Sequence, residues 1–500
     1  MTALERQAPS GISSPAERAT PASLLARPVP IGLVVAALVA ASLAVRLWCA
    51  RGPLWLDEIW SIENLAPLTR FWQVFWGISH DNNHFLNSLW LYFATGFSAD
   101  ERILRAPSIA MGAMTVAMAA RIAARHSPAA AVAAGAMAAA SYFLVNYSVE
   151  ARGYSGMALA ILVAFDAMER AAARPDSRAR LVFAAAAGIG LLWHLAMLPV
   201  IALFALIHLF EQRREIGRWE PTAAATLRFL APTFVAVLPA VAFVVAGVAV
   251  VGRLTIGGVR AFDAGQALGA IADMARDTIG LPLAAPTGLI LAVGAAAILI
   301  ALRLRLVLND RRIAYAVILL GLPAAVFILR PPNAHIPRYY LVCALFLVLI
   351  AAEVFGSLWR GGAWGRSAAL AALAAILIGD ASLLIRYQAS KDTAWPQALA
   401  AIEDSGERAI ASSFDDRVGK LVAYYNRSHP PLDLIARDHW CGAPPRWFIA
   451  ETANVPDLPA DLDLPAGDCR VRFGLVRRYE TWGLSKVQWA LYRHNAEQSN

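Results

Sequence analysis

The chain has 500 residues, of which 58% are hydrophobic and only 16% charged, with four cysteines and a formal net charge of +8. Soluble globular domains carry about 25% charged residues, so this composition excludes an ordinary soluble protein and favours a membrane protein. The basic residues are spread over short turns between apolar segments. This distribution argues against a nucleic-acid-binding protein, which would gather them on one soluble face.

The N-terminal residues 1–28 are rich in Ala, Pro, Ser and Arg, which predicts a disordered cytoplasmic tail. The first apolar run, "IGLVVAALVAASLAV", follows at 31–45. A cleaved signal peptide is the alternative to a membrane span here. Arg46 and Trp48 stand where small cleavage-site residues would be expected, so we favour an uncleaved first helix.

About eleven segments are long and apolar enough to span a bilayer as helices, because hydrocarbon leaves backbone groups no other local partner. They lie at roughly 29–48, 104–121, 128–146, 154–170, 180–194, 196–210, 228–250, 286–303, 312–329, 339–357 and 367–386. The sequence therefore predicts a polytopic α-helical membrane domain over 29–388.

The arginines predict the orientation of this domain. With a cytoplasmic N-terminus, the cytoplasmic turns hold Arg121, Arg125, Arg170, Arg174, Arg178, Arg180, Arg213, Arg214, Arg218, Arg303, Arg305, Arg311, Arg312, Arg360 and Arg366. The opposite loops are longer and poorer in Lys and Arg, which is the positive-inside pattern.

The C-terminal residues 389–500 change character, with alternating apolar residues in "AIASSF" and "WFIA" and Pro-rich turns between them. This pattern predicts a small α/β domain, which an odd number of spans places outside the cytoplasm. Cys441 and Cys469 both lie in this domain, where an oxidising compartment favours a disulfide. Two unpaired thiols are the alternative, since spacing alone does not fix geometry.

The polar clusters with chemical potential all fall on the predicted outer face. They are "WLDEIW" (55–60), "HDNNHFLNSLW" (80–90), "NYSVEARGYS" (146–155), His194 and "RPPNAHIPRYY" (330–340). The first outer loop, 51–104, also carries Trp and Phe at helical spacing, which predicts short helices in the membrane interface. Ionisable groups near membrane depth are costly and indicate function.

Each cluster alone has a plainer explanation. Asp57 and Glu58 fit a helix N-terminus, which favours acids. Glu150 and Arg152 fit a surface ion pair, and Arg338 with its neighbouring tyrosines fits an interfacial anchor belt. Their gathering on one face favours a common site.

These motifs resemble the polytopic GT-C glycosyltransferases, in particular the bacterial branch near family 39, with protein mannosyltransferases and lipid A aminoarabinose transferases as relatives. The similar stretches are "WLDEIWS", "HFLNSLWLYFATGFSADERILRAPSIAMG", "NYSVEARGYSGMALA" and "RYYL", mainly within residues 30–210. The histidine–proline pair that the family usually has before the second-loop helix is "NHFLN" here, with Phe85 at the proline position.

The resemblance implies a GT-C fold and an inverting sugar transfer from a polyprenyl-phosphate donor at the outer face of the bacterial inner membrane. The acceptor would be lipid A or its core, another envelope glycan, or a protein. We name Asp57, as general base, and its neighbour Glu58 as the candidate catalytic residues. The candidate substrate-binding residues are His84, Glu150, Arg152, Tyr154, His194, Arg338 and Tyr339. Some relatives use a divalent cation and others do not, so the sequence leaves a metal cofactor open.

Two other classes of function remain as alternatives. A secondary transporter would have helices broken near the midplane with polar groups at the breaks. A non-catalytic membrane scaffold would use the outer domain for binding and would tolerate conservative changes at Asp57.

The arginine distribution makes a direct prediction about topology. Single cysteines introduced at positions 80, 150 and 335 should react with an impermeant maleimide in intact spheroplasts, and one at position 216 should not. Labelling at position 216 alone would place the polar clusters on the cytoplasmic face.

Overall fold

The computed structural model describes residues 30–78, 80, 83–173, 177–252, 259–281, 285–391, 395–427, 430–452, 454–479, 482–484 and 487–495. The predicted tail 1–28 and Arg174 of the predicted cytoplasmic turns lie outside the described residues.

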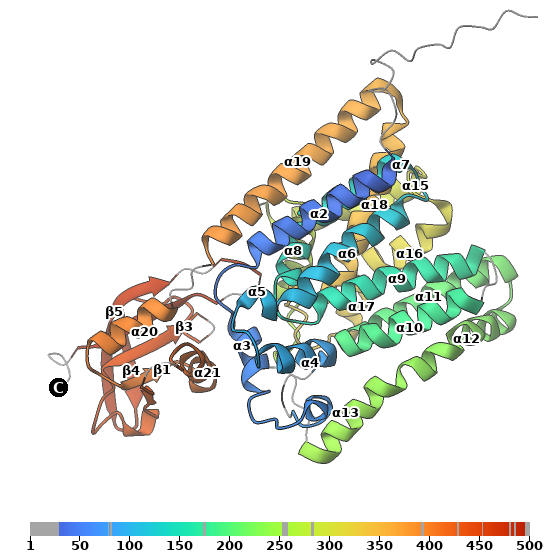
Figure 1. Cartoon of the computed structure of the whole chain (residues 1–500). Helices are drawn as coiled ribbons and strands as arrows, with labels where there is room; N and C mark the ends of the chain where they lie inside the picture. Colours follow the sequence, from blue (N-terminus) through green and yellow to red (C-terminus); the bar gives the residue numbers. More distant parts are fainter. Residues whose placement is uncertain are drawn as a thin grey trace, which may run out of the picture.

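Most described residues are helical, and the helices form a bundle with a small sheet domain beside one end (Figure 1). The helices of the bundle are α2 (Ile31–Cys49), α6 (Ala106–Ala123), α7 (Pro128–Ala140), α8 (Tyr142–Ser148), α9 (Tyr154–Ala173), α10 (Ser177–Trp193), α11 (Met197–Ile216), α12 (Trp219–Ala236), α13 (Leu238–Val251), α14 (Ala264–Thr278), α15 (Thr287–Arg303), α16 (Arg312–Ala316), α17 (Leu322–Leu329), α18 (Leu341–Trp359) and α19 (Gly362–Ala389). Shorter helical turns are η2 (Asn309–Arg311), η3 (Val317–Gly321) and η4 (Pro337–Tyr340).

Every predicted span overlaps a helix, but fewer helices than predicted are long and apolar enough to cross a membrane. Among the described residues, five helices meet this condition, and seven do if each of two bent pairs counts as one span. The remaining predicted spans correspond to α9, α10, α11 and α15. Helices α10 and α15 have only 17 residues each, and α9 and α11 end in charged turns. Several membrane-spanning helices are therefore supported, whereas the number eleven stays a prediction.

Two of the spans are broken. Helices α7 and α8 meet at 56°, and α12 and α13 meet at 48°. At the first break, Arg46 of α2 donates to the carbonyls of Ala138 and Ala139, and the Asp380 carboxylate accepts the backbone N–H of Tyr142 at 2.9 Å. At the second break, Pro239 lacks an N–H and its ring excludes the carbonyl four residues earlier.

An ion-pair network closes the end of the bundle opposite the polar clusters. Arg311, which is buried, pairs with Glu169 near the end of α9 and with Glu353 near the end of α18. Arg125 pairs with Glu169 and Asp166. At its other end, α9 begins with Tyr154, and α18 begins shortly after Arg338. The ion-pair network and the polar clusters therefore lie at opposite ends of these two helices. Which end faces the cytoplasm stays a prediction.

The first outer loop contains short helices, as the sequence predicts. They are α3 (Leu56–Glu63), η1 (Phe71–Phe75), α4 (Phe85–Ala94) and α5 (Glu101–Leu104). Phe71 and Trp72 of η1, Phe93 of α4 and Phe97 in the turn after α4 remain exposed, which suits an interfacial position.

The C-terminal domain contains one mixed sheet of six strands in the order β2-β1-β3-β6-β5-β4. Its elements are α20 (Trp395–Asp404), β1 (Ala409–Ser412), α21 (Asp415–Tyr425), β2 (Asp433–Leu434), η5 (Arg437–His439), β3 (Trp447–Glu451), β4 (Asp461–Ala466), β5 (Cys469–Tyr479) and β6 (Trp489–His494). Strand β1 pairs in parallel with β2 and β3, and the remaining pairs are antiparallel. An α/β domain is therefore present where the sequence predicts one.

The C-terminal domain is fixed to the first outer loop. Helix α21 packs against α3, and Ile59 of α3 belongs to the same buried apolar cluster as Leu421 of α21 (Figure 1). The Tyr425 hydroxyl donates to the carbonyl of Leu54 at 2.5 Å. The domain thus supports the helix that carries Asp57.

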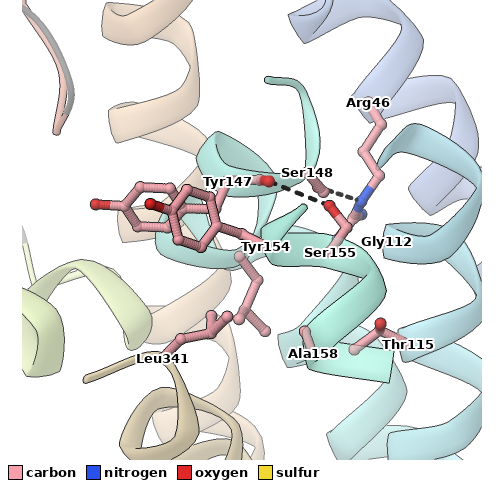
Figure 2. A pocket seen from close by; sticks show the side chains of 10 residues that line it. Arg46, Gly112, Thr115, Tyr147, Ser148, Tyr154, Ser155, Ala158 and Leu341 are labelled. Carbon is pink, nitrogen blue, oxygen red and sulfur yellow. Dashed lines mark hydrogen bonds between the residues drawn. The ribbon is translucent and has the colours of Figure 1, made fainter. Parts of the chain in front are cut away.

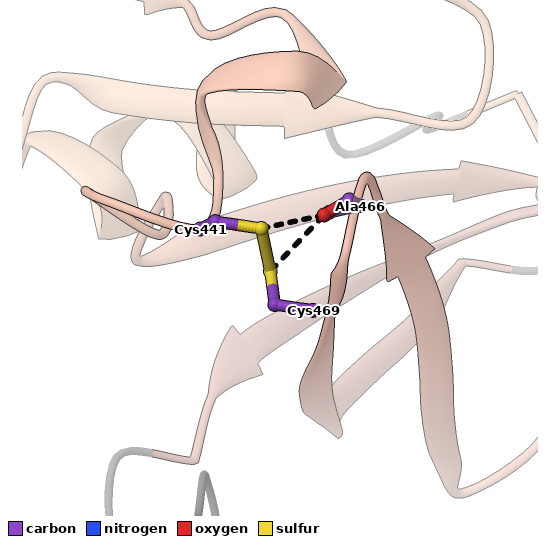
Figure 3. Close-up of a disulfide and its surroundings, with 3 residues drawn as sticks. All are labelled: Cys441, Ala466 and Cys469. Atoms are coloured by element: carbon purple, nitrogen blue, oxygen red, sulfur yellow. Dashed lines mark hydrogen bonds between the residues drawn. A yellow bond between two sulfur atoms is a disulfide. The ribbon is translucent and has the colours of Figure 1, made fainter.

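Cys441 and Cys469 form a disulfide with a Cα–Cα distance of 5.7 Å (Figure 3). The bridge joins the segment after η5 to the first residue of β5, and the Ala466 carbonyl lies beside both sulfurs. The bridge therefore ties the long connection between β2 and β3 to the turn between β4 and β5.

The loop that this disulfide closes predicts its contribution to stability. With a sequence separation of 28 residues, the chain-entropy model gives about 3.5 kcal/mol. The double variant Cys441→Ala/Cys469→Ala should therefore unfold at lower denaturant, as followed by tryptophan fluorescence. If the unfolding midpoint of the double variant equalled that of the oxidised wild-type protein, the bridge would add nothing to stability.

Candidate functional site

Helix α3 starts with the two acids of the first outer loop in its first turn. Trp55 before it is extended, and the Glu58 carboxylate accepts the Trp55 backbone N–H at 3.0 Å, as in a capping box. Acids in a first turn are also favoured by the helix dipole. Successive residues project about 100° apart on a helix, so Asp57 and Glu58 enter different surroundings.

Glu58 is completely buried and makes four hydrogen bonds. Besides Trp55, its carboxylate accepts the Ala151 backbone N–H at 2.7 Å. It also accepts a two-pronged contact from the guanidinium of Arg105, at 2.8 and 2.7 Å. Arg105 in turn donates to the carbonyls of Ala50, Gly52 and Pro53.

These contacts do not fit the predicted catalytic role of Glu58. A general base must have an oxygen within reach of the substrate proton, and both Glu58 oxygens are engaged inside the protein. The contacts of Glu58 suit a residue that caps and positions α3, and a catalytic role for it stays a prediction.

Asp57 is the accessible member of the pair, with 23% of its side chain exposed. Its Oδ2 lies 3.3 Å from Arg338 Nη1 and 3.6 Å from Arg152 Nη1. Arg152 Nη1 also donates to the Asp57 carbonyl at 3.2 Å, which holds this guanidinium beside the carboxylate. One exposed carboxylate therefore lies between two guanidinium groups from separate elements.

The segment before α9 brings Arg152 to this position because two glycines let it approach the end of α10. A Cβ on Gly153 would lie 1.7 Å from the Trp193 carbonyl oxygen, and one on Gly156 would lie 2.1 Å from the Trp193 ring. The Arg152 carbonyl accepts from the Ser108 hydroxyl at 2.8 Å. "EARGYSG" is thus a close-packing motif as well as a source of polar groups.

Tyr154 lies at the centre of the site. Its ring centroid is 4.5 Å from that of His194 and 5.5 Å from that of Tyr147. The guanidinium carbons of Arg338 and Arg152 lie 5.7 and 6.0 Å from the same ring. These distances suit cation–π contacts.

The two candidate histidines lie near each other, with ring centroids 6.2 Å apart. His84 Nε2 is 3.2 Å from the Ser61 hydroxyl, and its Nδ1 contacts Asn83. His194 Nδ1 accepts the Ala196 backbone N–H at 3.0 Å. Burial and the nearby charge of Arg152 hold the pKa of His84 well below its ordinary value, so this ring is neutral at physiological pH.

Two other predicted residues lie beside this group. Glu150 is buried and accepts from the Asn146 side chain at 3.1 Å. Tyr339 is 39% exposed at the start of the segment that leads into α18. Sequence reasoning missed Arg105 and Tyr147. A single arginine at the start of the apolar segment 104–121 was a signal for the first, and the position of the second within the polar cluster 146–155 was a signal for it.

The residues present do not offer a ligand set for a divalent cation. No group of three His, Cys, Asp or Glu side chains within the described ranges could hold a metal ion. The ring nitrogens of His84 are occupied, and the nearest charges to Asp57 are guanidinium groups.

A small cavity lies next to the site, between α2, α6 and α9 (Figure 2). Arg46 lines it and donates to the Ser148 hydroxyl at 2.8 Å. Tyr147 and Tyr154 also line this cavity, and their hydroxyls point away from Arg46 in this view (Figure 2).

No protein-family model matches the chain, and no curated protein is similar enough to match it. The likeness to GT-C glycosyltransferases therefore rests on the sequence motifs.

The Arg105–Glu58 contact makes a prediction about stability. Arg105→Met leaves a buried carboxylate without its counter-charge, which costs about 3–5 kcal/mol. We expect a large fall in the melting temperature of the purified protein and partial recovery in Arg105→Met/Glu58→Gln.

Arg102→Met is the matched control on α5. Arg102 pairs with Asp100 at 2.6 Å, but Arg102 is exposed and Asp100 is partly exposed, so this change should lower the melting temperature far less. Equal losses in the Arg102 and Arg105 variants would contradict the importance of the buried pair.

Proposed function

We propose that the chain is an inverting glycosyltransferase that moves a sugar from a polyprenyl-phosphate carrier to an extracytoplasmic acceptor. The observation that carries this proposal is the accessible Asp57 carboxylate between Arg338 and Arg152, at 3.3 and 3.6 Å. A base beside two cations suits a reaction that takes a proton from one partner and releases a phosphate from the other.

The reaction needs only one protein base. The acceptor oxygen forms a bond to the anomeric carbon while the bond from that carbon to the phosphate oxygen breaks. The acceptor proton passes to Asp57, and the bonding electron pair leaves with the phosphate. Because phosphate is a good leaving group, no protein acid has to protonate it. A positioned general base contributes about 10² to 10⁴-fold to such a step.

Arg152 and Arg338 are suited to the phosphate. Guanidinium groups match phosphate oxygens with paired donors, and they act where negative charge develops. In the absence of a donor, Asp57 Oδ2 contacts both guanidinium groups. We infer that a bound phosphate competes for them and leaves the Asp57 carboxylate facing the acceptor.

Further parts of the proposal follow from the surroundings of Asp57. Exposed aromatic residues of the first outer loop suit contact with membrane lipids at the outer face of the bacterial inner membrane. The C-terminal domain packs on α3, so it would border the acceptor, which is lipid A or its core, another envelope glycan, or a protein.

A secondary transporter remains the second candidate because two spans are broken, at 56° and 48°. Its binding groups should lie at the breaks. At the α7–α8 break, however, Arg46 is already engaged with the carbonyls of Ala138 and Ala139. Sugar-independent solute uptake into sealed vesicles would favour the transporter.

The glycosyltransferase proposal predicts that Asp57→Asn, which is nearly isosteric, abolishes sugar transfer in reconstituted vesicles while folded protein and donor binding remain. Asp57→Glu should lose about 100-fold in kcat, because an extra methylene moves the base by about an ångström. Transfer is measured with radiolabelled donor and extracted envelope acceptor.

Glu63→Gln is the matched control, since Glu63 ends the same helix and takes no part in the site. It should retain normal turnover. Normal turnover in Asp57→Asn would falsify the assignment of the base.

A further inference from the structure

Three buried hydrogen-bond donors of the site have no hydrogen-bond partner within the described part of the chain. They are the Tyr147 hydroxyl, His194 Nε2 and Arg338 Nε. Buried polar atoms are paired in the large majority of cases, so a local group of exceptions calls for a ligand. The three come from α8, from the turn between α10 and α11, and from η4.

These donors surround one ring. Tyr147 and His194 lie 5.5 and 4.5 Å from Tyr154, measured between ring centroids, and the Arg338 guanidinium lies 5.7 Å from the Tyr154 ring. Tyr147 and Tyr154 also point their hydroxyls in the same direction (Figure 2). The unsatisfied donors therefore belong to one place in the molecule.

The tautomer of His194 follows from its one hydrogen bond. Nδ1 accepts the Ala196 backbone N–H at 3.0 Å, so in the neutral ring the proton is on Nε2. His194 is 3% exposed, so solvent does not satisfy this N–H. Metal binding through Nε2 would move the proton to Nδ1, where it would face the Ala196 N–H. His194 is thus suited to donate a hydrogen bond and not to bind a metal.

The chemistry of the missing ligand follows from this set. A tyrosine hydroxyl, a neutral imidazole N–H and a guanidinium N–H all donate, and Arg152 adds a second cation beside Asp57. A ligand that is rich in acceptors and negatively charged therefore fits this set.

We propose that Tyr147, His194 and Arg338 together form a hydrogen-bond cradle for the phosphate of the lipid carrier, in which His194 acts as a neutral donor. The identity of the carrier rests on the proposed function. The cradle holds the phosphate on the Tyr154 side of the guanidinium pair, and it leaves Asp57 to the acceptor.

The test measures equilibrium binding to the purified full-length chain in detergent by titration calorimetry. Farnesyl phosphate is the probe, farnesol is its neutral counterpart, and inorganic phosphate is the competitor that lacks the lipid chain. We expect farnesyl phosphate to bind far more tightly than farnesol and inorganic phosphate to displace it at high concentration.

The variants address the donors one at a time. Tyr147→Phe and His194→Phe should each weaken farnesyl phosphate binding about tenfold, because each removes a hydrogen bond to a charged group. His194→Gln keeps an N–H donor and should lose less than His194→Phe. Farnesol binding should not change in any of them.

Two matched controls separate this effect from general damage. Tyr142→Phe removes another buried hydroxyl from the same helix, one packed against Tyr387 and Trp482. His208→Phe removes a buried histidine that contacts Thr226. Both should bind farnesyl phosphate normally.

Wild-type affinity in both Tyr147→Phe and His194→Phe would overturn the cradle, as would farnesol binding as tightly as farnesyl phosphate. If a Phe variant does not fold, farnesyl phosphate binding by His194→Gln and the wild-type preference for farnesyl phosphate over farnesol still test the cradle. Phosphate binding that depends on these donors, in a protein that transfers no sugar, would refute the glycosyltransferase and leave the cradle standing.

Discussion

The buried contact between Arg105 and Glu58 is the interaction on which the Asp57 end of the bundle depends. Its two side chains are almost fully buried, and they connect α3, the chain after α2 and the segment before α9. Such a pair adds little net stability, because desolvation offsets the attraction between the charges. Its effect is on geometry. Since separating the charges is costly, arrangements in which these three segments move apart are disfavoured, and Asp57 and Arg152 stay close.

The buried arginines elsewhere in the bundle have partners, although isolated groups such as the Tyr142 and Thr233 hydroxyls have none within the described ranges. Arg46 is engaged with carbonyls and hydroxyls at the α7–α8 break, and Arg311 pairs with Glu169 and Glu353 at the far end. The group around Tyr154 differs, because three donors there lack hydrogen-bond partners among the described residues. Buried polar side chains thus bond to other protein groups in one part of the bundle, and in another part they retain donors that a ligand can use. A local group of buried donors without hydrogen-bond partners, more than the presence of charge, distinguishes this candidate site from a structural network.

The sequence predicted the helical bundle, the short helices of the first outer loop, the C-terminal α/β domain and the gathering of Asp57, Arg152, Tyr154, His194 and Arg338. Hydrophobic runs and the outer-face pattern carry that information. The number of spans is harder to predict, because apolar runs such as 180–194 and 286–303 are helices of only 17 residues. Adjacent acids also look alike in sequence. Only the direction of each side chain shows that Glu58 points into the protein while Asp57 remains accessible, and that Tyr147 faces the site.

The position of Asp57 also depends on residues that are very distant in the chain. Tyr425 of α21 bonds to Leu54 across a sequence separation of 371 residues, and the ammonium group of Lys420 lies 5.2 Å from the Trp60 ring. Helix α3 is therefore held by Arg105 on one side and by the C-terminal domain on the other. These contacts with α3 are apolar, hydrogen-bonded or cation–π. Because a displacement of about an ångström can cost about 100-fold in rate, this domain can influence the chemistry through packing alone.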